Sequence, residues 1–523
     1  MSDHQTTGKI HAMAVAVSCF AAFGGFLYGY DTGYISGVKE MDAWLAIFGK
    51  AVVGDDGTTT YELTSGTSSI VTSILSVGTC IGALLAYPVG EKLGRRWGIE
   101  LYLILFFIGV ACQTGAKSLA GFAVGRVFAG LGVGGTSCLV PLYQAECSPR
   151  SVRGALVAAY QWMITIGILI AAVVVNGTKD MGSAASYQWP IALQFIWGAI
   201  LAVGLLFLPE SPRWLLTKGR EEQARHSLCR IFSAQPDSLE INEEMAEINA
   251  NIAAERALGE PSFFDAFRGG PGKNGLRTFT GCALQALQQL TGINFIFYYG
   301  TTFFQNSGIS DPFLITIATD VVNVGATVPG LWMVDKFGRR PLLLGGAAGM
   351  FIAQFIVAAI GDSVSTDNLA GQKALVAFVC IFIAFFAATW GPLAWTVTSE
   401  IYSPSLRSKC MALSTASNWL LNFAIGYATP YLVDKAPGSA GLQTNVFWIW
   451  GGCCVLCFIF TYFFIMETRQ LSLEQCDILY RQGVPPRKSN AFRKQILAEN
   501  IHDSDLNPKA TMGEKDEKEH IEA

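Results

Sequence analysis

The hexapeptide Glu91-Lys92-Leu93-Gly94-Arg95-Arg96 recurs 244 positions later as Asp335-Lys336-Phe337-Gly338-Arg339-Arg340. Two shorter matches share one offset, 257 residues: Gln161-Trp162 with Asn418-Trp419, and Pro209-Glu210-Ser211 with Met466-Glu467-Thr468. Short motifs that repeat at a common spacing indicate a duplicated unit. The sequence therefore predicts two homologous halves.

Apolar runs of roughly 20 residues, the length that crosses about 30 Å of hydrocarbon, occur six times in each half. They lie near 12–37, 66–90, 98–117, 119–142, 154–176 and 188–208, and near 277–302, 312–334, 341–361, 373–398, 408–431 and 444–466. Hydrophobic residues make up 51% of the chain and charged residues only 15%, whereas soluble domains carry about 25% charge. We expect an all-α membrane protein with twelve transmembrane helices in two six-helix halves.

The regions outside these runs predict the remaining domain organisation. Residues 1–11 are expected to form a cytosolic N-terminus, 12–208 and 277–466 the two bundles, and 467–523 a largely disordered cytosolic tail. Between the bundles, residues 209–276 are polar, but Ile241, Met245, Ile248 and Ile252 recur at helical spacing. This spacing predicts short amphipathic helices that lie under the bundles.

The distribution of basic residues predicts the orientation, because Lys and Arg are retained on the cytoplasmic side. Four short loops on one side hold these residues: Lys92, Arg95, Arg96, Arg150, Arg153, Lys336, Arg339, Arg340, Arg407 and Lys409. The loops on the other side contain Lys but no Arg. Both termini are therefore expected inside, which places the Asn176-Gly177-Thr178 sequon outside. Glycosylation of Asn176 and chance occurrence of the sequon both stay open.

Two charged residues inside the predicted spans are singled out as candidates for a function, Asp31 in the first and Arg126 in the fourth. A charge near the bilayer centre costs at least about 2.5–3.5 kcal/mol. One interpretation is a static ion pair that joins two helices. The other is a proton switch, in which protonation of Asp31 releases Arg126 and pairing with Arg126 favours release of the proton.

Amide side chains form a second polar set in otherwise apolar spans. They are Gln161, Gln288, Gln289, Asn294, Asn323, Asn418 and Asn422. Amides donate and accept hydrogen bonds, which suits a neutral ligand with many hydroxyl groups; the alternative is hydrogen bonding between helices. Gly292 allows the seventh span to break so that Gln289 and Asn294 both face inward. Aromatic residues, among them Trp395, are expected to complete the cavity with flat faces.

Charged residues on the cytoplasmic side form a third set. Its members are Arg95, Arg96, Glu146, Arg153, Glu210, Arg339, Arg340, Glu400, Arg407 and Glu467. They serve either as simple topological anchors or as ion pairs that close the inner face and break when the two halves rock.

Several function classes have no support in the sequence. The chain has no GxxxxGK[ST] motif, and its five histidines form no metal or triad pattern, so no enzyme activity, metal or cofactor is expected. A net charge of −4 without a basic stripe argues against a nucleic-acid partner.

The motifs taken together resemble those of the sugar porter family of the major facilitator superfamily, and most closely the fungal hexose transporters. The matching stretches are Gly29-Tyr30-Asp31-Thr32-Gly33, Gly94-Arg95-Arg96, Gly338-Arg339-Arg340, Gly125-Arg126-Val127-Phe128-Ala129-Gly130, Pro141-Leu142-Tyr143-Gln144-Ala145-Glu146, Pro209-Glu210-Ser211-Pro212-Arg213-Trp214-Leu215 and Gln288-Gln289-Leu290-Thr291-Gly292-Ile293-Asn294.

The resemblance implies the major facilitator fold and alternating access around a central sugar site. It implies that Gln161, Gln288, Gln289, Asn294, Asn323, Trp395 and Asn418 bind a monosaccharide, and that Asp31 and Arg126 couple its transport to a proton, a co-substrate. The expected function is a proton-coupled hexose importer, with glucose the best single substrate. A passive facilitator and a glucose sensor are the alternatives. The family also implies a plasma-membrane protein that works as a monomer in the lipid bilayer.

Overall fold

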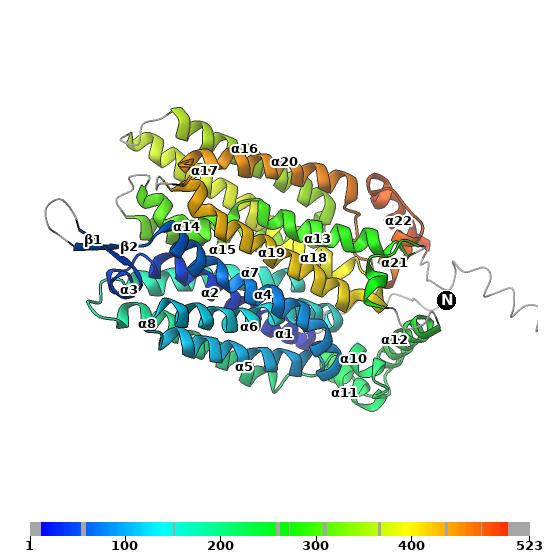
Figure 1. Ribbon diagram of the computed structural model, residues 1–523. Helices are drawn as coiled ribbons and strands as arrows, with labels where there is room; N and C mark the ends of the chain where they lie inside the picture. Colours follow the sequence, from blue (N-terminus) through cyan, green and yellow to red (C-terminus); the bar gives the residue numbers. More distant parts are fainter. Residues whose placement is uncertain are drawn as a thin grey trace, which may run out of the picture.

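The computed structural model describes residues 12–53, 59–149, 152–257, 262–270, 272–306, 311–363, 368–434, 438–471 and 473–499 (Figure 1). The predicted cytosolic N-terminus, 1–11, and the last part of the predicted tail, from 500 onward, lie outside these residues.

Helices dominate the described chain, and each half contains six long helical segments. In the N-terminal half they are α1 (Ala12–Ala21) continuing as α2 (Phe23–Val38), α4 (Ser65–Leu93), α5 (Arg95–Thr114), α6 (Leu119–Cys147), α7 (Arg153–Thr178), and α8 (Ala185–Ala192) continuing as α9 (Gln194–Leu205). In the C-terminal half they are α13 (Asn274–Leu290) with α14 (Ile293–Asn306), α15 (Pro312–Phe337), α16 (Arg339–Ser363), α17 (Leu369–Ala388) with α18 (Trp390–Glu400), α19 (Arg407–Val433) and α20 (Val446–Phe464).

Ten of these segments are long and apolar enough to cross a membrane. The other two are the pair α13 and α14, which a break divides into short helices, and α19, whose polar residues include Asn418 and Asn422. Both departures involve residues predicted to form the cavity. The functional side chains therefore make these two segments less typical of the membrane.

The two halves lie side by side, with the N-terminal half in blue to cyan and the C-terminal half in green to orange (Figure 1). Three helix pairs form most of the contact between the halves: α4 with α19, α7 with α15, and α2 with α14. Because each pair takes one helix from each half, a ligand held between them touches both bundles.

The predicted break in the seventh segment is present at Thr291 and Gly292. Gly292 has φ +81°, a conformation that residues with a Cβ rarely adopt. A Cβ at this position would lie 2.5 Å from Cγ of Trp450. The glycine therefore allows both the turn of the backbone and the close approach of α20.

Replacement of Gly292 by alanine is expected to destabilise the protein. The left-handed backbone costs a residue with a Cβ about 1–2 kcal/mol, and the clash with Trp450 adds to this cost. Thermal unfolding of the purified protein in lipid measures the effect as a lower melting temperature. The matched control is Gly452→Ala on α20, where a Cβ meets nothing within 4 Å; an equal loss in both variants would contradict the argument.

One end of the bundle, here called the linker end, carries the helices that connect the halves (Figure 1). They are α10 (Pro212–Thr217), α11 (Glu221–Phe232), α12 (Leu239–Ala257) and the 3₁₀ turn η1 (Phe263–Ala266). Ile241, Met245 and Ile252 are buried against Trp214 and Leu228. The predicted short amphipathic helices are therefore present.

The prediction of a disordered tail from residue 467 is wrong for residues 473–499. Helix α21 (Leu473–Arg481), the turn η4 (Pro486–Lys488) and helix α22 (Ser489–Glu499) occupy this stretch. The buried Asp477 of α21 forms an ion pair of 2.6 Å with the buried Arg277 of α13, and Ile478 and Leu479 are also buried. This buried ion pair attaches α21 to the bundle. The spacing of apolar residues in the sequence gives no sign of such an attachment.

The opposite end, here called the hairpin end, contains a feature that the all-α prediction omitted. Strands β1 (Lys50–Val53) and β2 (Thr59–Glu62) pair antiparallel, with Lys50 opposite Glu62, beside the short helix α3 (Asp42–Phe48). The hairpin lies outside the bundle (Figure 1), so it does not change the architecture around the site.

Candidate functional site

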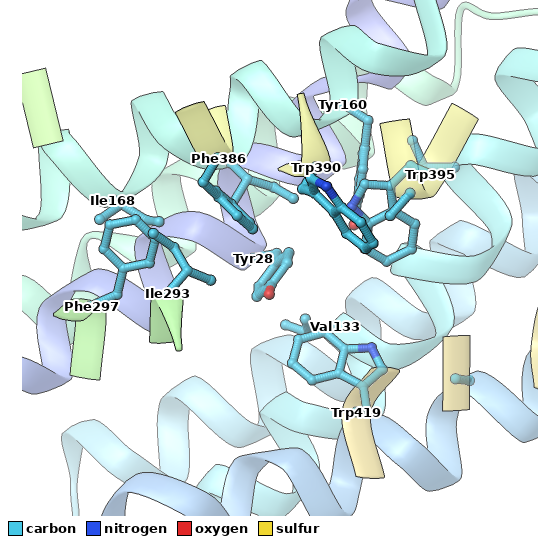
Figure 2. Packing of buried hydrophobic residues seen from close by; sticks show 14 of the residues in the cluster. Tyr28, Val133, Tyr160, Ile168, Ile293, Phe297, Phe386, Trp390, Trp395 and Trp419 are labelled. Atoms are coloured by element: carbon cyan, nitrogen blue, oxygen red, sulfur yellow. The ribbon is translucent and has the colours of Figure 1, made fainter. Parts of the chain in front are cut away.

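A small cavity lies between the two halves near the middle of the bundle. Its lining comes from α2, α7, α13, α14, α17 and α18: Tyr28, Thr32, Gln161, Ile164, Ile168, Gln288, Gln289, Ile293, Asn294, Phe297, Phe386 and Trp395. Figure 2 shows Tyr28, Phe297, Phe386 and Trp395 around this region. The volume is about 20 Å³, room for about one water molecule. The walls are therefore closed together in this conformation.

Amides of the broken seventh segment form the polar wall. Gln288 Nε2 donates to the carbonyl oxygens of Trp390 at 3.1 Å and Gly391 at 2.9 Å. Gln289 Nε2 donates to Gln288 Oε1 at 3.2 Å, and Asn294 Nδ2 donates to Gln289 Oε1. Because the helix restarts after Gly292, Asn294 faces the same space as Gln289.

Helix α19 extends this network behind the lining. Asn422 Nδ2 donates to Gln289 Oε1 at 3.1 Å, and Asn422 Oδ1 accepts from Ser76 at 2.7 Å and Tyr298 at 2.9 Å. Since Ser76 belongs to α4, the network links the two halves as well as three segments of the C-terminal half.

Asn418, one turn earlier on α19, joins the same amides. Its Nδ2 donates to Gln288 Oε1 at 2.8 Å and to Gln285 Oε1 at 2.7 Å. Gln285 in turn donates to Thr398 of α18 at 3.2 Å. These bonds hold the orientation of Gln288.

Aromatic side chains supply the other surfaces. Trp395 Nε1 donates to Gln161 Oε1 at 3.1 Å, which joins α18 to α7 across the halves. The Tyr160 ring meets Trp395 edge-on at 5.4 Å, and the Tyr28 ring meets Trp419 at 4.8 Å. Aromatic faces beside amides suit a neutral ligand with an apolar face and many hydroxyl groups.

The predicted site residues divide into three groups. Gln161, Gln288, Gln289, Asn294 and Trp395 line the cavity. Asn418 and Asn422 stand behind it and bind the lining amides. Asn323 lies apart: it is buried on α15, outside the lining, and neither of its amide atoms has a partner among the described residues.

Several contributors were missing from the sequence prediction, among them Tyr28, Thr32 and Gln285. Tyr28 and Thr32 line the cavity from α2, and Gln285 binds Asn418. The motif around Asp31 contained Thr32, and Gln285 lies one turn before Gln289 on the same face of the helix. Nothing in the sequence distinguishes Tyr28 from the many core aromatics.

The two predicted membrane charges meet. Asp31 Oδ2 lies 3.4 Å from Nη1 of Arg126, and both side chains are fully buried. Arg126 Nη1 also donates to Tyr34 at 3.0 Å, and Tyr34 donates to Gln113 at 2.6 Å. Nε and Nη2 of Arg126 have no partner among the described residues. One guanidinium nitrogen, Nη1, therefore makes every contact with Asp31: it lies 3.4 and 3.5 Å from the two carboxylate oxygens and 3.5 Å from the backbone carbonyl oxygen, all of them long.

At the hairpin end, contacts between the halves cover the cavity. The ammonium of Lys39 lies 3.7 Å from the ring centre of Tyr299, Thr302 donates to Glu40 at 2.6 Å, and Ser65 donates to Asp434 at 2.8 Å. Burial of Lys39 lowers its pKa to about 8, although Glu40 and Asp434 favour its charged form. The closed hairpin end thus holds a buried cation against an aromatic ring.

At the linker end, each half contains one buried ion pair from the predicted charged set. Arg95 contacts Glu146 at 3.0 Å, and Arg339 contacts Glu400 at 2.7 Å. The halves meet where Arg95 Nη2 donates to Ser408 of α19 at 3.2 Å. Symmetrically, Asp335 Oδ2 accepts from the backbone N–H of Ala155 in α7 at 3.0 Å.

Two other acids of the set cap helices. Glu210 accepts from the backbone N–H groups of Arg95 and Arg96 at the start of α5, and burial raises its pKa while these backbone donors oppose the shift. Glu467 accepts in the same way from Arg339 and Arg340 at the start of α16. These carboxylates thus bind helix N-termini, where negative charge is favoured.

The remaining basic residues of the set bind backbone or are buried nearby. Arg96 and Arg340 donate to the carbonyl oxygens of Leu208 and Tyr462. Arg153 donates to the carbonyl oxygen of Ser148 at 3.3 Å. Arg407 is buried at the start of α19.

Asn176 lies in the last turn of α7 and is half-buried. Thr178 of the same sequon is buried, and its hydroxyl donates to the carbonyl oxygen of Val175 at 3.3 Å. Glycosylation of Asn176 stays a prediction, and this helical position does not favour it.

Comparison with known proteins connects this geometry to a family. The family described as "Sugar (and other) transporter" matches residues 17–480. The chain is 47% identical to the major facilitator-type transporter ecdD of Aspergillus rugulosus, covering 94% of this chain and 92% of that protein. It is 45% identical to the probable glucose transporter rco-3 of Neurospora crassa (90% and 80%), and 40% identical to the high glucose sensor RGT2 of Saccharomyces cerevisiae (93% and 63%).

Solved structures of the xylose transporter XylE from E. coli have the same fold. The proton:xylose symporter XylE bound to 6-bromo-6-deoxy-D-glucose gives a TM-score of 0.76 at 27% identity, over 90% of this chain and 99% of that one. Its inward-open form gives 0.66 over 89% and 99%. The predicted major facilitator fold is therefore confirmed, and the chain belongs to the sugar porter family of the major facilitator superfamily, whose members are transporters and not enzymes.

Proposed function

We propose that this hexose transporter is a proton-coupled importer, that glucose is its substrate, and that it works by alternating access. The Asp31–Arg126 pair carries the proton coupling. A fully buried charge pair is costly unless its hydrogen bonds are complete, yet here a single guanidinium nitrogen contacts the two carboxylate oxygens at 3.4 and 3.5 Å, and the other two nitrogens have no partner among the described residues. Such a pair is easier to break than a static clamp, which supports the proton switch.

The cavity supports a neutral sugar as the ligand. Its lining has four amides and several aromatic rings, and none of its residues is charged. Amides match hydroxyl groups that both donate and accept, while aromatic faces pack on the C–H face of a pyranose. The likeness to rco-3, a probable glucose transporter, supports glucose among the hexoses.

The transport cycle alternates between the two closed ends. Opening of the hairpin end parts Lys39 from Tyr299 and admits sugar, and a proton on Asp31 frees Arg126. The hairpin end then closes, the linker end opens, and both substrates leave. We assign the linker end and both termini to the cytoplasm and the protein, acting as a monomer, to the plasma membrane.

Replacement of Glu400 by glutamine is expected to favour opening of the linker end. Glutamine keeps the shape but removes the charge that holds the buried Arg339, and breaking a buried pair costs about 3–5 kcal/mol. Arg339 also donates to Asp335 at 3.1 Å, the acceptor of the Ala155 N–H across the halves, so its displacement weakens closure of the linker end. Fewer molecules then present the site to the hairpin side, so the apparent KM for external sugar rises about tenfold or more. The measurement is initial uptake against sugar concentration.

The matched control for this prediction is Glu221→Gln on α11, which removes the same charge from an exposed position of the linker. Its KM should equal that of the unchanged protein. An unaltered KM in Glu400→Gln would show that the Arg339–Glu400 pair plays no part in closure.

The decisive experiment is uptake of radiolabelled glucose into proteoliposomes with and without an inward proton gradient, followed by a proton ionophore. Accumulation above equilibrium that the ionophore collapses supports symport. Uptake that only reaches equilibrium supports the second candidate, a passive facilitator. The cavity favours this second candidate: because none of its lining residues is charged, it can bind a sugar without a proton. Absence of uptake for every hexose would support a sensor, the role named for the relative RGT2.

A further inference from the structure

Helix α15 buries a second acid at membrane depth, Asp320, which the proposed mechanism does not use. Its side chain is 1% exposed, and neither carboxyl oxygen has a hydrogen-bond partner among the described residues. Asn323, three residues later, is equally buried and has neither amide atom paired. Residues three apart share a face of a helix, so an acid and an amide form one unpartnered polar patch.

The helices packed against α15 give Asp320 no counter-ion. These helices include α7, α14, α16, α17 and α18, and the charges of Arg339 on α16 and Glu400 on α18 pair with each other at the linker end. Lys179, just after α7, lies over the Phe313 ring, and α17 contributes Lys373 in its first turn and the thiol of Cys380. Tyr298 and Tyr299 of α14 donate instead to α19. No ion pair of Asp320 occurs among the described residues.

An ionised carboxylate in this position would be very costly. Removal of an isolated charge from water without a partner costs many kcal/mol, and the group takes up a proton instead. A neutral carboxyl also suits Asn323, because its O–H donates to an amide oxygen and its C=O accepts from an amide N–H. The patch therefore fits a carboxylic acid rather than a carboxylate.

A chain of hydroxyl groups begins one turn from Asp320 on α15 and leads towards α2; no hydrogen bond joins Asp320 itself to this chain among the described residues. Thr316, one turn before Asp320 on α15, lies 3.3 Å from the hydroxyl of Thr301 on α14. Thr301 lies 3.2 Å from the hydroxyl of Ser36 on α2. Next to Thr301, Thr302 bonds Glu40 in the hairpin-end closure. Separation of α2 from α14 at this end would therefore bring water to the hydroxyl chain and to α15.

We propose that Asp320 is a proton-binding site of the C-terminal half, distinct from the Asp31–Arg126 pair. It holds a proton on its carboxyl group while the hairpin end is closed. When that end opens, the O–H bond breaks, the proton passes to water and the carboxylate is hydrated. Closure reverses the step, so Asp320 releases one proton and takes up one proton in each transport cycle. The protonation of Asp320 does not depend on the proposed function; only the role of this proton in the transport cycle rests on it.

Infrared spectroscopy of the full-length protein in lipid, with ¹³C-labelled aspartate, tests the occupancy directly. We expect a protonated-carboxyl C=O band near neutral pH that Asp320→Asn removes and Asp31→Asn retains. The matched control is Asp311→Asn, which leaves the N-cap of the same helix intact because asparagine also caps. If Asp320→Asn does not fold, Asp320→Ser takes its place. A band unchanged in the Asp320 variant would overturn the proposal.

Sugar counterflow without any ion gradient tests the exchange of the proton. The rate in the unchanged protein should vary with pH over the range in which the band titrates, and Asp320→Asn should lose that dependence. An identical pH profile would leave Asp320 as a fixed structural acid and overturn the proposal. So would a band that appears only when sodium and potassium are replaced by choline, because the patch would then bind a metal cation.

The two proposals fail separately. If glucose only equilibrates in proteoliposomes while the Asp320 band and its pH dependence persist, the proton site stands and symport does not.

Discussion

Gln289→Ala is expected to abolish measurable sugar binding while leaving the protein folded in the membrane. Gln289 Oε1 accepts from both Asn294 and Asn422, and its Nε2 donates to Gln288. Alanine removes this amide from the cavity wall and leaves two buried donors unpaired. An unpaired buried group costs about 1–3 kcal/mol; in the variant the sugar hydroxyls that would bond Gln289 are buried without this partner, and a loss of about 3 kcal/mol weakens binding roughly 100-fold.

Glucose binding to the purified protein, together with uptake into proteoliposomes, measures this effect. The control is Gln188→Ala, which removes an amide that bonds the carbonyl oxygen of Thr114 near the hairpin end and should bind glucose normally. Thermal unfolding of both variants separates loss of the ligand site from loss of the fold. Unchanged uptake in Gln289→Ala would place the sugar site elsewhere.

Asp31→Asn is expected to eliminate accumulation of sugar above equilibrium while exchange of sugar for sugar survives. Asparagine has nearly the same shape but can neither take up a proton nor hold Arg126 by charge, so the helices pack and the proton no longer controls the pair. Without a proton to carry, the gradient cannot drive transport, although the sugar site still moves between the two sides.

The measurement compares gradient-driven uptake with counterflow in the same proteoliposomes. Asp180→Asn, an exposed acid after α7, serves as the control and should accumulate sugar normally. Retained accumulation in Asp31→Asn would assign the coupling to another acid, and Asp320 would be the first to examine.

The architecture was predictable because its determinants are local. Apolar runs of sufficient length marked each span, and Gly292 was correctly expected to break the seventh span. The tenth segment also breaks, just before Gly391-Pro392: α17 ends at Ala388 and α18 begins at Trp390. The proline still accounts for it, because it removes a backbone donor in the first turn of α18.

The site was predictable in composition but not in geometry. Polar residues in apolar runs revealed Gln288 and Gln289, yet the same signal included Asn323, which faces another part of the bundle. The direction of a side chain depends on helix rotation and packing, and neither can be read from a single span. Asp320 lies within an apolar run, so the sequence contained the same signal for this residue, a polar side chain in a predicted span. That Asp320 has no counter-ion became visible only from the surrounding helices.

The amide network also has a consequence for how quickly cargo is released. In the closed conformation Gln288, Gln289, Asn294 and Asn418 already bond one another or the backbone. An arriving sugar must exchange these bonds for its own, and such an exchange yields only about 0.5–1.5 kcal/mol per bond. The bound sugar therefore stays in the site only briefly. A modest affinity allows rapid turnover, because a transporter that bound its sugar tightly would release it slowly.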